Sequence, residues 1–118
     1  MDFEFYYTER GNSDVKEWLD DLVEKANAGD RDAQELVKNF YYCVSLAFEG
    51  MPYSRPLTKG MFELRPSNSA EWHRIPYIIW RNKLLLLSEF RKKSGKTSPE
   101  EIKKAIRRMK DWIRRYGK

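Results

Sequence analysis

The most basic stretch of the chain, FRKKSGKTSPEEIKKAIRRM, runs from Phe90 to Met109. Lysine and arginine side chains at this density suit two kinds of chemistry: binding of phosphate groups, as in a nucleic acid, and docking of an acidic protein. A solvated helix surface is the plain alternative. Elsewhere, Arg65 ends MFELR and Arg74 lies in HRIPYIIW. A guanidinium held on a strand presents a fixed fork of donors to phosphate oxygens.

The charges are distributed unevenly along the 118 residues. Residues 1–54 hold 5 Lys/Arg and 12 Asp/Glu, a balance of −7, and residues 55–118 hold 18 and 6, a balance of +12. The net charge of +5 hides this contrast. The contrast predicts a basic face for phosphate or for an acidic partner, and charge alone does not distinguish the two.

Length and composition favour a single domain over residues 1–118. Hydrophobic residues make up 41%, with 4 Trp, 7 Tyr and 6 Phe, which argues for a substantial core and against disorder. The N-terminus resembles no leader, and no apolar run approaches the ~20 residues of a membrane span. We therefore expect a soluble cytoplasmic protein. The single cysteine, Cys43, excludes an internal disulfide and is expected to be a buried structural thiol.

Hydrophobic periodicity and turn signals predict the element order β-α-α-β-β-β-α. The prolines at 52 and 56 predict a loop over residues 50–56, and Pro76 inside a strand predicts an edge position or a bulge. The expected strands lie at 3–7, 61–65, 72–80 and 84–87, and the expected helices begin after Asn12 or Ser13, after Asp30, and after Ser98 at the capping box SPEE.

These elements predict an α+β fold: a small, twisted, mainly antiparallel sheet with an N-terminal helix hairpin and a C-terminal helix. The helices are expected to cover one face of the sheet and to leave the other open. Glu63, Arg65 and Arg74 should point to the open face and form a concave basic surface with Lys59 and the run 91–93. This run is predicted as a loop, where binding residues often lie.

Four blocks give the chain a resemblance to a known family. They are EWLDDL (17–22), RPLTKGMFELR (55–65), HRIPYIIW (73–80) and LLLLSEFRKKSGKTSPEEIKKAIRRM (84–109). In this order they resemble the phage-derived HigB-like branch of the RelE/ParE toxin superfamily. The resemblance spans nearly the whole chain, and the segment 90–99 and the GMFELR block are its most specific parts.

The resemblance implies a RelE-like fold and the toxin of a type II toxin–antitoxin system. The implied activity is a ribosome-dependent endoribonuclease that cuts mRNA, without a cofactor, and inhibits translation. The implied partners are the ribosome, mRNA and a cognate antitoxin, usually of the helix-turn-helix type, in a toxin–antitoxin hetero-oligomer. We also expect acidic residues of the antitoxin to cover the basic face.

RNA cleavage of this kind uses the 2′-OH as nucleophile on the adjacent 3′-phosphate. The enzyme must accept a proton, stabilise a dianionic phosphorane and protonate the leaving 5′-oxygen, and cations with an acid–base pair can do this without a metal. The sequence shows no strong metal motif. The predicted catalytic residues are Arg65, Arg74, Lys92, Lys93 and Lys59, and the predicted RNA-binding residues are Arg91, Lys96, Phe90 and Arg55.

The resemblance implies that Arg65 stabilises the transition state, and an internal ion pair with Glu63 or Glu71 is its alternative role. Arg74 serves as a second phosphate clamp or as a structural residue. Lys92 or Lys93 contacts the scissile phosphate or acts as the acid. The other expected roles are phosphate binding or general base for Lys59, RNA backbone contact for Lys96, and base stacking or core packing for Phe90.

The proton acceptor is left open by the sequence. His73 is the only histidine, but strand alternation points it away from Arg74, which favours a packing role. Where the family has a tyrosine near the last helix, this chain has Thr97 or Ser98, which are poor bases. Two alternatives therefore remain: a ParE-like toxin that poisons gyrase without nuclease chemistry, and an inactive RNA-binding module.

Overall fold

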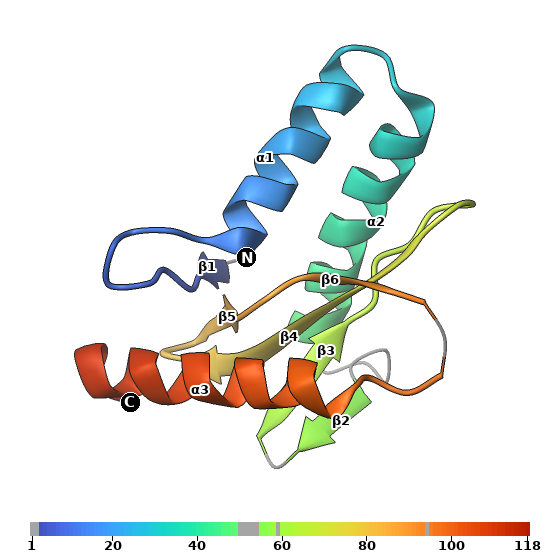
Figure 1. The fold of residues 1–118 in the computed structure, drawn as a ribbon. Coiled ribbons are helices and arrows are strands. Elements are labelled where there is room, and N and C mark those ends of the chain that lie inside the picture. The colour runs from blue at the N-terminus through green and yellow to red at the C-terminus, as the bar shows by residue number, and fades with distance from the viewer. Residues whose placement is uncertain (1–2, 50–54, 59, 94) are drawn as a thin grey trace.

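The computed structural model describes residues 3–49, 55–58, 60–93 and 95–118. These residues form three helices and six strands, which confirms the α+β class (Figure 1). In chain order they are β1 (Phe3–Phe5), α1 (Asp14–Asn27), α2 (Arg31–Phe48), β2 (Arg55–Thr58), β3 (Met61–Leu64), β4 (Trp72–Trp80), β5 (Lys83–Leu86), β6 (Phe90–Lys92) and α3 (Pro99–Tyr116). None of these helices has both the length and the apolar character to cross a membrane.

The helices begin where the sequence predicted side-chain caps. Ser13, Asp30 and Ser98 each accept a hydrogen bond from the backbone N–H three residues further along. Each side-chain oxygen satisfies a donor that has no partner within the first helical turn. Pro99 occupies the first turn of α3, where its missing N–H leaves no helical bond unmade.

The strands form one sheet in the order β1-β5-β4-β3-β2, with β6 paired to β4. All pairs are antiparallel except β1 with β5. Strand β2 begins inside the predicted loop 50–56, and β6 includes Arg91 and Lys92 of the run 91–93 that is predicted as a loop. Pro56 is tolerated in β2 because β2 is an edge strand. Strand β6 forms because β4 has 9 residues and β5 only 4, so the first half of β4 requires another partner.

Pro76 lies within β4, a central strand, so the predicted edge position is wrong and the predicted bulge is correct. Between the β4–β6 and β4–β5 pairings, two residues of β4 face three residues, 87–89, of the opposite segment. The Pro76 carbonyl accepts from the Leu87 N–H at 2.9 Å, but Pro76 has no N–H to donate in return. The Arg108 guanidinium donates to the Leu87 carbonyl at 2.9 Å, so α3 is attached to the sheet at the bulge.

The expectation that all helices cover one face of the sheet is wrong. Helices α1 and α2 lie side by side on one face, and α3 crosses the opposite face (Figure 1). Leu84 and Leu86 of β5 pack in the core beneath α1 and α2, whereas Leu85 and Leu87 pack beneath α3. An unbroken run of leucines is typical of a strand that is buried on both faces.

Candidate functional site

The candidate site lies on the part of the α3 face that α3 leaves open. Met61 of β3 is buried beneath α3, and Glu63 and Arg65 point to the same face because side chains alternate along a strand. Arg74 of β4 lies on this face as well, since Ile78, four residues further, packs beneath α3. The expected face is therefore present, but it is half covered rather than open along its length.

Glu63 is the centre of a cluster of polar side chains. Its carboxylate is buried, and one oxygen lies 3.5 Å from Arg65 Nε and 3.8 Å from Arg74 Nε. The other oxygen accepts a hydrogen bond from the Thr97 hydroxyl at 2.9 Å. One carboxylate between two guanidinium groups leaves a net positive charge on this face, as an anion site requires. We call Glu63, Arg65, Arg74 and Thr97 the Glu63 cluster.

Arg65 keeps part of its side chain open to solvent. The ion pair with Glu63, one of the two alternatives for Arg65, is formed through Nε, while 32% of the Arg65 side chain remains exposed. Arginine carries five N–H donors, so engagement of Nε is compatible with phosphate binding through the terminal nitrogens. Arg74 is more deeply placed, with 12% exposed and an N–H donated to the His73 carbonyl at 2.9 Å.

Lysines from β6 and the loop after it complete the candidate site. Lys92 and Lys96 line a cavity of about 260 Å³ together with Glu63. A neighbouring cavity of about 320 Å³ is lined by Phe90, Lys92, Lys93 and Lys96. Lys93 and Lys96 are exposed, and Lys92 is half-buried. The structure thus brings Lys92 and Lys96 close to the Glu63 cluster, while their roles stay predictions.

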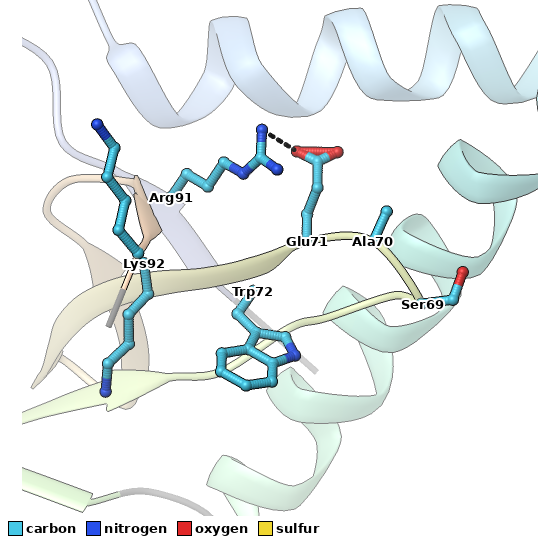
Figure 2. Close-up of a pocket in the computed structure, with 7 residues that line it drawn as sticks. Ser69, Ala70, Glu71, Trp72, Arg91 and Lys92 are labelled. Atoms are coloured by element: carbon cyan, nitrogen blue, oxygen red, sulfur yellow. Dashed lines mark ion pairs between the residues drawn. The ribbon is translucent and has the colours of Figure 1, made fainter. Parts of the chain in front are cut away.

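Arg91 lies on the other side of β6 from Lys92. In register it faces His73, on the α1 side of the sheet, and its guanidinium is 3.8 Å from the Glu71 carboxylate (Figure 2). Arg91 is therefore not brought to the Glu63 cluster, although 60% of its side chain is exposed. It lines a third cavity, of about 500 Å³, with Ser69, Ala70, Glu71, Trp72, Lys92 and Lys93.

The structure describes neither Lys59 nor the side chain of Arg55, two of the predicted site residues. Lys59 lies outside the described residues. Arg55 begins β2, where its backbone pairs with Glu63, but its side chain falls outside the described part of the structure. For Lys59, phosphate binding or a role as general base stays a prediction, and so does RNA binding by Arg55.

His73 packs in the interior, as predicted, whereas Cys43, predicted as a buried thiol, is only partly buried. Only 5% of His73 is exposed, and its ring nitrogens lie 2.6 Å from the Glu89 carboxylate and 3.2 Å from the Glu71 carboxylate. Its ring packs on Trp18, with 5.3 Å between the centroids. Cys43 is partly buried against the core under α1 and α2, and this burial raises the pKa of its thiol. Among the described residues, no group of three or more His, Cys, Asp or Glu side chains is placed to hold a metal ion.

Several cations of α3 are engaged within the molecule. They pair with carboxylates of the acidic first half and of α3 itself: Arg108 with Asp14 at 2.7 Å, Lys104 with Asp14 at 3.6 Å, Arg114 with Glu9 at 2.6 Å, and Arg115 with Asp111 at 2.8 Å. Part of the charge contrast is thus neutralised inside the fold. The basic stretch therefore divides into a structural helix and a segment, 90–97, that borders the candidate site.

Two residues near the candidate site were missed or undervalued from the sequence. Thr97 was considered only as a poor base, yet its hydroxyl joins the loop before α3 to Glu63 across 34 residues of chain. A contact of that sequence separation leaves no local signal. Trp72 was read only as a strand residue, although 58% of it is exposed. Its position two residues before Arg74, on the same face, was the signal available.

Comparison with known proteins identifies one family. The family model described as phage derived protein Gp49-like (DUF891) matches residues 17–110. The match begins in α1, ends in α3, and includes every residue of the Glu63 cluster. No curated protein shows a significant match to the chain.

Proposed function

Because the chain belongs to the Gp49-like family of phage-derived proteins, we propose that it is the toxin of a type II toxin–antitoxin system. The proposed activity is that of a ribosome-dependent endoribonuclease that cuts mRNA and so stops translation. The family is one of RelE-type, toxin-like proteins, and the helix hairpin, mainly antiparallel sheet and C-terminal helix agree with a RelE-like fold.

The arrangement of cations around Glu63 is the observation that carries this proposal. Arg65 and Arg74 approach one carboxylate from neighbouring strands, and Lys92 and Lys96 line the cavity that Glu63 also lines. Arg74 lies in β4 and Arg65 directly follows the last residue of β3, so their donors are positioned before a substrate binds. Preorganised donors of this kind stabilise charge that develops in a transition state.

The proposed reaction is an internal transesterification of RNA. The 2′-oxygen attacks the adjacent phosphorus, the bond from phosphorus to the 5′-oxygen breaks, and the products are a 2′,3′-cyclic phosphate and a 5′-hydroxyl. The 2′-OH gives its proton to a base, and an acid supplies a proton to the leaving 5′-oxygen. Both atoms and charges balance without an oxidant or a further reactant.

The roles assigned to the side chains follow their positions. Arg65, whose side chain is partly exposed, stabilises the phosphorane, and Arg74 supports it from β4. Lys92 contacts the scissile phosphate or protonates the leaving group, because it lines the cavity beside Glu63. Lys93 and Lys96 neutralise neighbouring phosphates, and Lys59 binds phosphate or acts as the base.

A toxin of this family also requires an antitoxin as its partner. We expect an antitoxin of the helix-turn-helix type whose acidic residues cover Arg65, Arg74 and Lys92. Titration of the complex with salt tests this placement, since a charge-dominated contact weakens as ionic strength rises. A dicarbonyl reagent that modifies arginine should react with Arg65 in the free toxin but not in the complex. Equal modification of free and bound toxin would exclude an antitoxin that covers Arg65.

One observation favours an RNA-binding module without cleavage as the second candidate. Among the described residues, neither a histidine nor a tyrosine side chain lines the three cavities next to the Glu63 cluster. Glu63 itself is engaged by two arginines and Thr97. A cationic site whose central carboxylate is already engaged binds phosphate without cutting it.

Expression of the chain without an antitoxin tests the proposal. The wild type should arrest growth and cut mRNA within reading frames, and Arg65→Ala should lower the cleavage rate by about 100- to 1,000-fold. The matched control is Arg31→Ala, which removes an exposed arginine at the start of α2 and should leave cleavage unchanged. Arrest with intact mRNA would indicate a gyrase poison instead, and no arrest by the wild type would indicate the binding module.

A further inference from the structure

We propose that Trp72 is a platform on which a base of single-stranded RNA stacks, next to the Glu63 cluster. This inference rests on the proposed function, because it assigns the position of a nucleotide that neighbours the bound phosphate. It concerns binding alone, so it is tested separately from cleavage.

Trp72 is placed differently from the other tryptophans. Trp18, Trp80 and Trp112 each pack against an aromatic ring, with centroid separations of 5.9 Å to Phe40 for Trp18 and 5.4 Å between Trp80 and Trp112. Trp72 has no such ring partner among the described residues, and 58% of it is exposed. Its flat face is therefore accessible to a ligand.

Lys92 lies on the same face as the exposed indole. Trp72 faces Lys92 across the β4–β6 pairing, and both line the cavity of about 500 Å³ with Arg91 and Lys93. Figure 2 shows the indole on the side of the strand opposite to Arg91 and Glu71. An aromatic side chain within a cationic groove is the arrangement with which proteins hold single-stranded nucleic acid, because the ring stacks on a base while the cations follow the backbone.

Trp72 lies next to the Glu63 cluster along β4. Trp72 and Arg74 are two residues apart on β4 and share a face, which separates them by about 6.6 Å along the strand. A base on Trp72 and a phosphate at Arg74 are thereby held as neighbouring parts of one RNA strand. Here β4 pairs with β6 on one side, and on the other side the Ser67–Trp72 bridge and the hydrogen bond from the His73 N–H to the Pro66 carbonyl hold it, so the spacing is rigid.

The chemistry of the cavity favours RNA over a protein partner. An exposed tryptophan at a protein interface is normally the centre of an apolar patch. Here Ala70 is the other apolar lining residue, and the remaining lining residues are Ser69, Glu71, Arg91, Lys92 and Lys93. The one carboxylate among them, on Glu71, is 3.8 Å from Arg91 and 3.2 Å from His73, so the cavity keeps a positive balance.

The test measures affinity for a short 2′-O-methyl oligoribonucleotide, which lacks the attacking hydroxyl and is not cut. Fluorescence anisotropy at low ionic strength is compared for the wild type, Trp72→Ala, Trp72→Phe and the control Tyr42→Ala, a residue that is also 58% exposed but lies on α2. Trp72→Ala should lose about fivefold to a hundredfold in affinity. Trp72→Phe should lose less, and Tyr42→Ala should match the wild type.

An oligonucleotide of the same length with abasic sites distinguishes stacking from phosphate binding. Stacking predicts that Trp72→Ala and the wild type bind the abasic probe equally. The proposal is overturned if Trp72→Ala binds the normal probe like the wild type, if Trp72→Ala weakens both probes alike, or if the wild type binds neither. Cleavage by the wild type with no Trp72 effect rejects only the platform, and a Trp72-dependent affinity without cleavage rejects only the nuclease.

Discussion

At the scale of single residues, Glu63 decides how the arginines can act. Its buried carboxylate lies between Arg65 and Arg74 and offsets one of their two positive charges. Without this carboxylate, the two guanidinium groups would repel each other and lose their common orientation. We therefore regard Glu63 as a positioning residue, and the Thr97 hydroxyl holds it from the loop before α3.

Replacement of Glu63 by glutamine keeps the side-chain shape and removes the charge. We expect Glu63→Gln to lower the free energy of unfolding by about 3 kcal/mol, because two partly buried arginines lose their counter-charge. Urea denaturation measures this. Glu24→Gln, at an exposed position of α1, should change the free energy by less than about 0.5 kcal/mol. Equal effects of the two substitutions would mean that the ion pairs of Glu63 contribute nothing.

At the scale of elements, α3 is attached to both layers that it meets. Its Arg108 donates to the Leu87 carbonyl at the bulge and to the Asp14 carboxylate at the start of α1. The hydrogen bond from Arg108 lowers the pKa of Asp14. These two contacts hold the middle of α3 against the sheet and α1, while the Thr97 hydroxyl just before α3 reaches Glu63.

The contribution of Arg108 to stability can be tested against that of its neighbour Arg107 on the same helix. Arg108→Met retains the aliphatic packing but leaves the Leu87 carbonyl without its donor, so the free energy of unfolding should fall by about 1.5–3 kcal/mol. Arg107→Met, at the exposed neighbouring position, should change it by less than about 0.5 kcal/mol. Thermal or urea unfolding of both variants measures the difference. A fall of the same size in both would show that helix charge, rather than this contact, stabilises the fold.

At the scale of the whole molecule, hydrogen bonds join the first and last segments of the chain. The Tyr6 hydroxyl donates to Asp111 at 2.6 Å, and Arg115 donates both to Asp111 and to the Tyr7 carbonyl. The contacts from Tyr6 and to the Tyr7 carbonyl thus join parts of the chain that are more than a hundred positions apart. The hydrogen bond from Tyr6, followed by those from Arg115 and Arg114, lowers the pKa of Asp111 to about 2.

This lowered pKa predicts a loss of stability in acid. A carboxylate whose folded pKa lies below its ordinary value of 3.8 stabilises the fold above that value. The contribution is lost as the pH falls from about 4 towards about 2, because the folded state then takes up the proton. Asp111→Asn should be less stable at neutral pH and should lose less stability on acidification. Urea midpoints across this range measure it, and parallel curves for both proteins would contradict it.

Local chemistry allowed much of the fold to be predicted. The caps at Ser13, Asp30 and Ser98 act within four residues, so their oxygens define where helices begin in any tertiary context. Alternation placed Glu63 and Arg65 on one face of β3 and turned His73 away from Arg74, which are consequences of strand geometry alone. For the same reason, the grouping of Arg65 with Arg74 was predictable once their strands were recognised as neighbours.

By itself, then, the sequence determined the element boundaries near caps, the facing of strand residues and the types of side chain available for phosphate. Only the tertiary structure decided that α3 crosses to the face opposite α1 and α2, that β6 pairs with the first half of β4, and that Thr97 binds Glu63. These outcomes depend on contacts between distant parts of the chain. Burial of both faces of the sheet stabilises the arrangement in which these contacts form, and no local sequence pattern predicts that burial.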